Sequence, residues 1–540
     1  MASVVMFYPV LENKPDVSCW KTLLLSVFSS MQLFTLGCEF DVVRSSAAGD
    51  INYQIWAAVL FFIAPFFTFG FVASLFQDFF AAMRLKWRKL AFKDVYVFSE
   101  MNEKSLYLAE DLHRNHKGST VVFCDVFEEK DEQFYELSER AQKIGAICFK
   151  KDILVVNFKT CSSHKTVSFF TIGESESENL IQTLKLIERY KTRSNVYVYA
   201  FSGGVEGEIL TAQVDKGKVK LRRINEVRSL INRELYENGK LLFDSAAETE
   251  GNKKISAVVI GMGNHGTEMV KSLAWFGQMD GYDLEINAFD RDLLAAERFS
   301  AIAPELMDEA HNGTVVEGES IYKITVHGGM DVESAAFVET VDRITDATFI
   351  FVALGNDRQN IMTAIGLRQK FEQMGAHPVI RAVVYNPQER EALTDIRNFR
   401  GQAYDIGFIG DLKSSYSEAV ILNSEVEEKA LARHKKWGDE ESFWAFEYNY
   451  RSSIASAIHA KLKRDLGLPG IEKIPADRTE EERWALRRLE HRRWNAYMRS
   501  EGYVYAGTGD KSGRNDLAKK HHCLVPFDKL SEEDQVKDDD

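Results

Sequence analysis

The sequence predicts an α/β fold built from two parallel-sheet domains in tandem, and three observations predict it. Short apolar runs rich in β-branched and aromatic residues alternate with helical stretches over residues 91–437, which is typical of repeated strand–helix–strand units. The alternation occurs twice with matching elements, which indicates a duplicated unit. At 540 residues the chain is also too long for a single hydrophobic core. We therefore expect domains at 91–245 and 253–437, separated by the polar stretch Ser245–Lys254.

Residues 1–90 are expected to form a membrane segment. Ile51–Gln77 contains no charged residue, and a bilayer-spanning helix needs about 20 apolar residues, so we expect a transmembrane helix over about 51–80. Basic residues from Arg84 to Lys93 follow it. The positive-inside tendency then places residues from about 81 onward in the cytoplasm, beneath a cell inner or plasma membrane. A buried core helix of a soluble protein is the alternative.

A shorter apolar stretch lies upstream, within residues 20–40. Its length fits a re-entrant segment or one thin spanning helix, and periodicity does not separate the two. Within the longer stretch, Pro65 and Gly70 are either bend points that transmit a signal or tolerated kinks in a passive anchor.

The composition argues against several kinds of partner and site. The net charge of −14 does not supply the basic face that nucleic-acid phosphates require, so no nucleic acid is expected as a partner. The six cysteines lack CxxC or other metal-ligand spacing, so neither a disulfide framework nor a metal site is expected. No secretory signal follows Met1.

The two halves of the predicted α/β region can be aligned element by element. In each half the second strand ends at an aspartate, Asp125 or Asp290. The other paired strands are 94–98 with 257–260, 166–172 with 347–354, and 195–200 with 378–384. Two copies of one fold explain this order.

The second half carries a glycine-rich turn between its first strand and the helix that follows, and the turn reads Gly261-Met262-Gly263-Asn264-His265-Gly266. In dinucleotide-binding (Rossmann) turns, the first glycine allows the bend, the second admits the pyrophosphate, and the third lets helix and strand pack closely. Asp290 lies about 20 residues further on, where an acid can accept a ribose hydroxyl. We therefore expect NAD(H) or another adenine nucleotide here, with a vestigial turn as the alternative. The same site is expected to include Arg291, Gly355, Asn356 and Asn360.

The first half lacks this turn. Its equivalent positions are Ser99, Met101 and Lys104, whose side chains would obstruct a pyrophosphate. The first half is therefore expected to bind no dinucleotide and to serve as scaffold, dimerisation surface or relay. Asn179 and Asn360, which follow the fourth strand of each half, are expected either to line the cleft or to cap helices.

No catalytic arrangement is recognisable in the sequence. The motifs HExxH, GxSxG and GxxxxGK[ST] are all missing. Tyr416 and His434 are isolated candidates that fit structural roles better. Binding without turnover is therefore expected, with no catalytic residues.

Residues 440–540 are expected to form a different, mainly helical module with a long helix over Thr479–Met498. Aromatic and basic side chains in it could stack a base or hold a phosphate, although such a face more often packs another helix. The candidate ligand face consists of Arg487, Glu490, Trp494, Tyr503, Lys520 and His522.

Three segments resemble known families. Glu490-His-Arg-Arg-Trp-Asn495, Glu501-Gly-Tyr-Val-Tyr505 and His522-Cys-Leu-Val-Pro526 resemble the RyR domain, a repeat first described in ryanodine receptors. Residues 91–435 resemble the paired RCK (TrkA N-terminal) domains that regulate potassium channels and transporters through bound nucleotides. Met31–Gly37 and the helix from Ile51 are similar to the pore helix and inner helix of two-helix channels.

This order implies an oligomeric, ligand-gated cation pathway of the potassium-channel type, with Thr35, Leu36 and Gly37 lining the pore. A potassium filter, however, has the sequence Thr-Val-Gly-Tyr-Gly. At the same place this sequence has Thr35-Leu36-Gly37-Cys38-Glu39, which lacks the second glycine and has an acid in its position. The resemblance therefore supports a membrane-bound nucleotide sensor more strongly than a conducting channel.

The leading hypothesis is a homo-oligomeric, membrane-bound regulatory protein whose partners are the lipid bilayer and a small nucleotide. A nucleotide-triggered membrane effector in defence or stress response is the first alternative. A membrane-anchored NAD-dependent oxidoreductase is the second.

Overall fold

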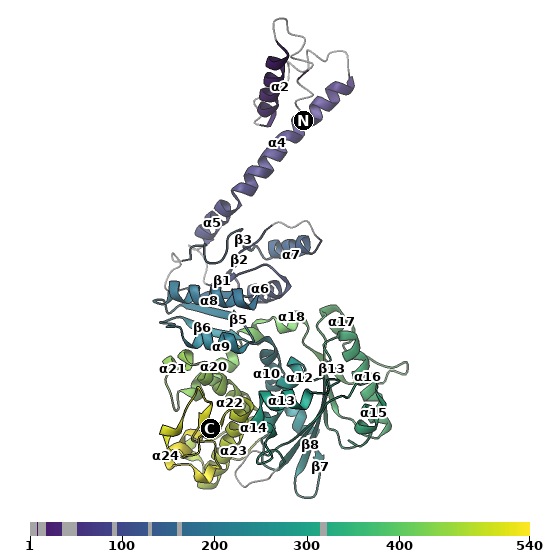
Figure 1. Cartoon of the computed structure of the whole chain (residues 1–540), viewed down its shortest axis with the longest axis vertical. Helices are drawn as coiled ribbons and strands as arrows, with labels where there is room; N and C mark the ends of the chain where they lie inside the picture. The colour runs from purple at the N-terminus through teal and green to yellow at the C-terminus, as the bar shows by residue number, and fades with distance from the viewer. Residues whose placement is uncertain are drawn as a thin grey trace. The chain divides into compact units, whose positions relative to one another are not determined.

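The computed structural model describes residues 8, 18–34, 51–88, 94–127, 132–158, 165–313 and 321–539, with only the backbone of 65–75 and 88. The chain divides into two compact units. One comprises residues 1–92, 125–127 and 147–152, and the other comprises 93–124, 128–146 and 153–540. Figure 1 shows both units.

The smaller unit contains the helices α2 (Cys19–Phe34), α4 (Ile51–Leu75) and α5 (Gln77–Arg88) and the short strand β3 (Ile147–Cys148). Leu33 of α2 packs against Ala57 and Ala64 of α4. The Asp78 carboxylate at the start of α5 accepts a hydrogen bond from the Lys150 backbone N–H at 2.7 Å. The helix expected over about 51–80 is thus two helices, α4 and α5.

Within the described residues, no helix combines the length and apolar character that crossing a membrane requires. The expected pore residues Thr35, Leu36 and Gly37 lie outside the described residues. Pro65 and Gly70 lie within α4, in the stretch whose side chains are not described.

The larger unit is α/β with two parallel sheets, as predicted. In the first sheet, five strands run in the order β2-β1-β4-β5-β6. Their bounds are β1 (Val95–Phe98), β2 (Thr120–Phe123), β4 (Val167–Thr171), β5 (Val196–Phe201) and β6 (Lys220–Ile224). The helices of this half are α6 (Glu103–Asn115), α7 (Glu132–Lys143), α8 (Glu176–Tyr190), α9 (Val205–Ala212), α10 (Glu226–Asn238) and α11 (Lys240–Asp244).

The second sheet repeats this arrangement in the order β10-β9-β8-β11-β12-β13, which is the strand order of many dinucleotide-binding sheets. The strands are β8 (Lys253–Ile260), β9 (Tyr282–Phe289), β10 (Lys323–His327), β11 (Phe349–Val352), β12 (Val379–Val383) and β13 (Ile406–Ile409). The helices are α12 (Asn264–Phe276), α13 (Ala295–Ile302), α14 (Pro304–Met307), α15 (Ala335–Asp342), α16 (Asp357–Gln373), α17 (Pro387–Ala392), α18 (Leu412–Ser415), α19 (Glu418–Ile421) and α20 (Ser424–His434).

The central strand β8 is buried on both faces of the second sheet. Val258 and Ile260 pack in one apolar cluster with Phe371 of α16, and the alternate residues Ala257 and Val259 pack in another cluster that includes α12. Helices on both faces are what a parallel sheet requires, because each face of its strands is apolar. The stretch Ser245–Lys254 is more ordered than a linker, since β7 (Ala247–Glu248) pairs antiparallel with the start of β8.

The C-terminal part contains α21 (Glu440–Ala445), α22 (Glu447–Asp465), α23 (Glu480–Ser500), α24 (Glu532–Gln535) and the paired strands β14 (Val504–Tyr505) and β15 (Lys520–His521). Its helices share a core with the second sheet: Ile458 of α22 and Leu489 of α23 belong to the same buried cluster as Leu273 of α12. The thirteen-residue helix α12 therefore connects the sheet to the C-terminal helices.

Candidate functional site

The glycine-rich turn lies between β8 and α12, at the strand-to-helix junction that the sequence predicts. Gly261 has a φ of +92°, a backbone conformation that side chains disfavour. A Cβ atom added there would lie 2.4 Å from the Ala353 carbonyl oxygen. Position 261 therefore requires glycine for two reasons: its backbone conformation, and the close approach of the chain segment that follows β11.

The other two glycines of the turn have contrasting surroundings. A Cβ at Gly266 would lie 1.7 Å from the Gly261 carbonyl oxygen, so only glycine lets α12 pack this closely on the turn. A Cβ at Gly263 would meet no described atom within 4 Å. Gly263 thus presents bare backbone to open space, which is the property that a diphosphate needs at the second glycine of such a turn.

Gly263 is also the N-cap residue of α12, and no side chain caps this helix. By contrast, Asn102, Ser175 and Asn356 cap α6, α8 and α16 with their own side chains. The first N–H groups of a helix have no partner within the helix and attract anions. The start of α12 therefore offers backbone donors to a ligand.

The turn opens into a cleft of about 2180 Å³, which exceeds the size of a typical small-molecule pocket. All the expected cofactor-binding residues line this cleft except Gly266 and Asn360, which are buried. The cleft lies at the carboxyl ends of β8 and β11, where the strand order of the sheet reverses. Ligands of open α/β sheets bind at this position.

Asp290 directly follows β9 and holds the turn. Its Oδ2 accepts a hydrogen bond from the Met262 N–H at 2.6 Å, and its Oδ1 accepts one from the Asp292 N–H at 2.8 Å. Each oxygen of a carboxylate can accept a second hydrogen bond. The Asp290 carboxylate can therefore still accept a hydrogen bond from a ribose hydroxyl, as expected. It also stabilises the turn through its bond to the Met262 N–H. The neighbouring Arg291 is exposed and lines the cleft.

The loop after β11 contributes the opposite rim of the cleft. Gly355 has a φ of +80°, and a Cβ there would meet no described atom within 4 Å. The Asn356 side chain accepts a hydrogen bond from the Gln359 N–H at 3.1 Å and so caps α16. Arg358, which sequence reasoning missed, is exposed in the first turn of α16 and lines the cleft.

Asn360 differs from the expectation, because it neither lines the cleft nor caps a helix. It is fully buried; its Oδ1 accepts from the Leu354 N–H at 2.6 Å and its Nδ2 donates to the Val383 carbonyl at 2.8 Å. Asn179 forms the matching bonds in the first half, to Gly173 and Phe201, although it also borders the cleft. Both asparagines tie the loop after the fourth strand to the end of the fifth.

His265 and Tyr385 meet at the mouth of the turn, with ring centroids 5.8 Å apart. Burial lowers the pKa of His265, and the nearby Glu226 only partly opposes this. Burial raises the pKa of Tyr385, and Asp357 raises it further. Both rings are therefore neutral at physiological pH and offer hydrogen-bonding and stacking surface without charge.

The equivalent bend in the first half is filled by the protein's own side chains. Ser99 is buried, and its hydroxyl accepts a hydrogen bond from the Ile172 N–H at 2.9 Å. Asn102 caps α6 and donates to the Ile172 carbonyl at 2.9 Å. The Glu100 carboxylate lies against Gly173, 2.1 Å from where a Cβ of that residue would be. Of the side chains expected to obstruct this bend, Ser99 lies in it, whereas Lys104 ion-pairs with Glu226 at 3.2 Å.

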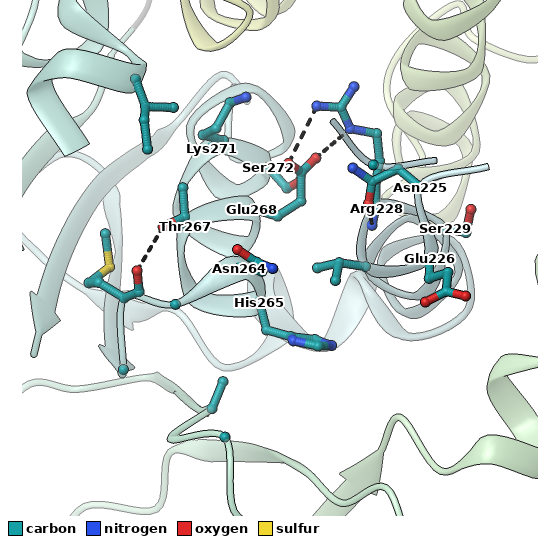
Figure 2. A pocket seen from close by; sticks show the side chains of 18 of the residues that line it. Asn225, Glu226, Arg228, Ser229, Asn264, His265, Thr267, Glu268, Lys271 and Ser272 are labelled. Atoms are coloured by element: carbon teal, nitrogen blue, oxygen red, sulfur yellow. Dashed lines mark hydrogen bonds and ion pairs between the residues drawn. The ribbon is translucent and has the colours of Figure 1, made fainter. Parts of the chain in front are cut away.

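The far wall of the cleft combines the first half with the C-terminal helices, and sequence reasoning missed it. Figure 2 shows the Arg228 side chain of α10 directed at Glu268 of α12; its Nε lies 2.6 Å from Oε1 of Glu268, and its Nη2 lies 3.0 Å from Glu501. Glu501 also ion-pairs with Arg451 and lies 3.7 Å from Lys271. No local sequence signal links these residues, because they come from distant parts of the chain.

The residues of the expected C-terminal ligand face do not gather on one surface. Arg487 forms a two-point ion pair with Asp539. Glu490 is 5% exposed and ion-pairs with Lys463 and Arg493. Trp494 packs on His521 with ring centroids 4.9 Å apart. Of the others, Tyr503 and His522 are buried and Lys520 is exposed. Most residues of α23 from Leu489 onward are buried, so Glu490 does not face solvent, and a ligand face here stays a prediction.

The two isolated catalytic candidates have structural surroundings. Tyr416 is buried, and burial together with Glu226 holds the pKa of its hydroxyl far above the ordinary value. His434 is buried, hydrogen-bonds to Ser442 at 3.0 Å and packs against Trp437. Neither residue lines the cleft.

No family model matches this chain, and no curated protein sequence does either.

Proposed function

We propose that this chain is a nucleotide-sensing regulatory protein whose second sheet is a Rossmann-type domain that binds NAD(H) or a related adenine dinucleotide. The observation that carries the proposal is the bare backbone at Gly263, at the uncapped start of α12 and facing a cleft of about 2180 Å³. The first half, whose equivalent bend is filled by Ser99, Asn102 and Glu100, acts in this proposal as a partner lobe.

Two arginines support an anionic ligand. Arg291 and Arg358 are both exposed and line the cleft, and no ion pair among the described residues involves either of them. Arg358 lies in the first turn of α16, where the helix dipole disfavours a cation. A bound diphosphate between the starts of α12 and α16 would offset this repulsion and pair with the guanidinium.

Asp290 favours a dinucleotide whose ribose has a free 2′-hydroxyl. A carboxylate fixed by the Met262 and Asp292 N–H groups can accept from that hydroxyl, whereas a 2′-phosphate would meet like charge. NAD(H) is therefore proposed to bind more tightly than its 2′-phosphorylated counterpart.

The regulatory part of the proposal rests on the make-up of the cleft wall. One cavity is lined by the first half, the second half and the C-terminal helices. A ligand that contacts all three stabilises the arrangement in which they close around it, and it can shift an equilibrium only through such differential contacts.

Membrane attachment through Ile51–Leu75 is a further step of the proposal, based on the charge-free sequence of that helix. The full chain is expected to float with liposomes, while a variant carrying Leu60→Lys and Ile63→Lys stays in the soluble fraction. A conducting assembly would also give nucleotide-dependent currents in planar bilayers. If the variant with two lysines still floats with liposomes, this helix does not attach the chain to membranes. If the chain inserts into planar bilayers but no current is recorded, it does not conduct ions.

Titration calorimetry of the purified full chain with NAD, NADP, ATP, AMP and cyclic dinucleotides tests the binding proposal. NAD is expected to bind, and Arg358→Ala should weaken it about tenfold or more, because a charged hydrogen bond contributes about 1.5–3 kcal/mol. The matched control is Arg397→Ala, which removes an exposed arginine that pairs with Asp395. Absence of binding by every diphosphate-containing nucleotide would refute the proposal.

A further inference from the structure

Outside the cleft, three metal-ligating side chains come together in the turn after β15. The candidate ligand atoms of His521, His522 and Cys523 all lie within 4.8 Å of one another. His521 and His522 are buried, and Cys523 is partly buried with a free thiol. Two imidazoles and one thiolate are the donor types that Zn²⁺ prefers.

His522 supplies an independent sign of a ligand. Its side chain is 7% exposed, and neither Nδ1 nor Nε2 has a hydrogen-bond partner among the described residues. Buried polar atoms are almost always paired, because leaving one unpaired costs about 1–3 kcal/mol. The two unpaired nitrogens of the His522 ring therefore indicate that a partner is missing, and a metal ion bound to one of them would be such a partner.

The neighbouring ring is held in place by packing. The His521 ring packs edge to face on Trp494 at 4.9 Å between centroids and stacks on His522 at 4.8 Å with an interplanar angle of 12°. Its Nδ1 accepts a hydrogen bond from the Cys523 N–H at 3.1 Å. Ligation of His521 through Nδ1 would replace this hydrogen bond with a bond to the metal.

We propose that His521, His522 and Cys523 bind Zn²⁺, with one nitrogen from each imidazole and the Cys523 Sγ as ligands. Three protein ligands leave the fourth position of a tetrahedral site to water. No spaced pair of ligands marks this site in the sequence, because a turn brings three consecutive residues together. The proposal is independent of nucleotide binding, since none of the three residues lines the cleft.

Cobalt titration of the chelator-treated full chain tests the site directly. Co²⁺ should produce a thiolate-to-metal charge-transfer absorption in the near ultraviolet, at one ion per chain, and added Zn²⁺ should remove it. Cys523→Ser should abolish this absorption, and His522→Ala should weaken Co²⁺ binding at least about tenfold. Cys124→Ser, which changes a buried cysteine of the first sheet domain, is the matched control and should behave like the unmodified chain.

A second measurement separates loss of the site from loss of the fold. Zn²⁺ at about 100 times its Kd should raise the Tm of the unmodified chain and of Cys124→Ser, but not the Tm of Cys523→Ser. The absence of a thiolate band in the unmodified chain, or a band that persists in Cys523→Ser, would overturn the proposal. A zinc-induced rise in Tm that Cys523→Ser retains would equally overturn it.

Discussion

Gly263→Val is expected to remove nucleotide binding while leaving the stability of the chain nearly unchanged. The φ of Gly263 is −67°, which any residue adopts, and a Cβ there meets no described atom within 4 Å. The two γ-methyl groups of valine would instead fill the space through which a diphosphate reaches the first N–H groups of α12. Losing two charge-assisted hydrogen bonds at about 1.5–3 kcal/mol each corresponds to a rise in Kd of about a hundredfold or more.

Isothermal calorimetry with NAD measures the change in affinity, and thermal unfolding without ligand measures stability, which should change by less than about 0.5 kcal/mol. Gly266→Val is the informative comparison within the same turn. Its Cβ would lie 1.7 Å from the Gly261 carbonyl oxygen, so this variant should lose stability as well as binding. NAD affinity that survives Gly263→Val would show that the open backbone is not the ligand site.

The parts of this fold that follow from the sequence are those that depend on local pattern. The strand β8 and the turn after it were predictable because buried parallel strands are continuous apolar runs and because glycine spacing records backbone geometry directly. The blocked bend of the first half was predictable for the same reason. Ser99 was one of the predicted occupants, but its bond to the Ile172 N–H and the parts played by Glu100 and Asn102 were not predictable, since these contacts join residues far apart in the chain.

The cleft wall shows why the rest was beyond sequence reasoning. Arg228 pairs with Glu268 and Glu501, and these three residues belong to the two sheet domains and the C-terminal part. Asn360 was misplaced because its position after the fourth strand fits a ligand contact as well as a tie between loops. An asparagine that binds a ligand and one that holds two loops together cannot be distinguished from the sequence, because the difference lies in their hydrogen-bond partners.

Glu490 was misassigned for a related reason. A polar face on a helix predicts exposure, yet α23 has Arg493 and Arg499 almost fully buried as well as its apolar residues. Helical periodicity assumes that charged residues face solvent, and this assumption fails where buried charges pair with one another. The sequence therefore suggested a ligand face at a place where the structure has an internal ion cluster.

Glu490→Gln is accordingly expected to destabilise the chain strongly. The Glu490 carboxylate is 3.0 Å from Lys463 Nζ and 2.9 Å from Arg493 Nη2, and it accepts a hydrogen bond from the Ser456 hydroxyl at 2.7 Å. Glutamine has the same shape but no charge, so the buried Lys463 and Arg493 would lose this carboxylate. Removing one partner of a buried ion pair costs about 3–5 kcal/mol, measurable as a lower urea midpoint.

The pH dependence of this loss identifies the charge as its cause. Burial alone would raise the pKa of Glu490, but Arg493, Lys463 and Arg433 hold it well below the ordinary value. A lowered pKa in the folded state contributes stability that is fully present above the unfolded pKa of about 4.3 and is lost as the pH falls through the folded value. The stability difference between the unmodified chain and Glu490→Gln should thus be constant between about pH 5 and 7 and shrink in more acidic solution.

Glu481→Gln, on the exposed first turn of the same helix, should change stability by less than about 0.5 kcal/mol. A Glu490→Gln difference as small as that of this control would mean that the buried carboxylate does not stabilise the C-terminal core.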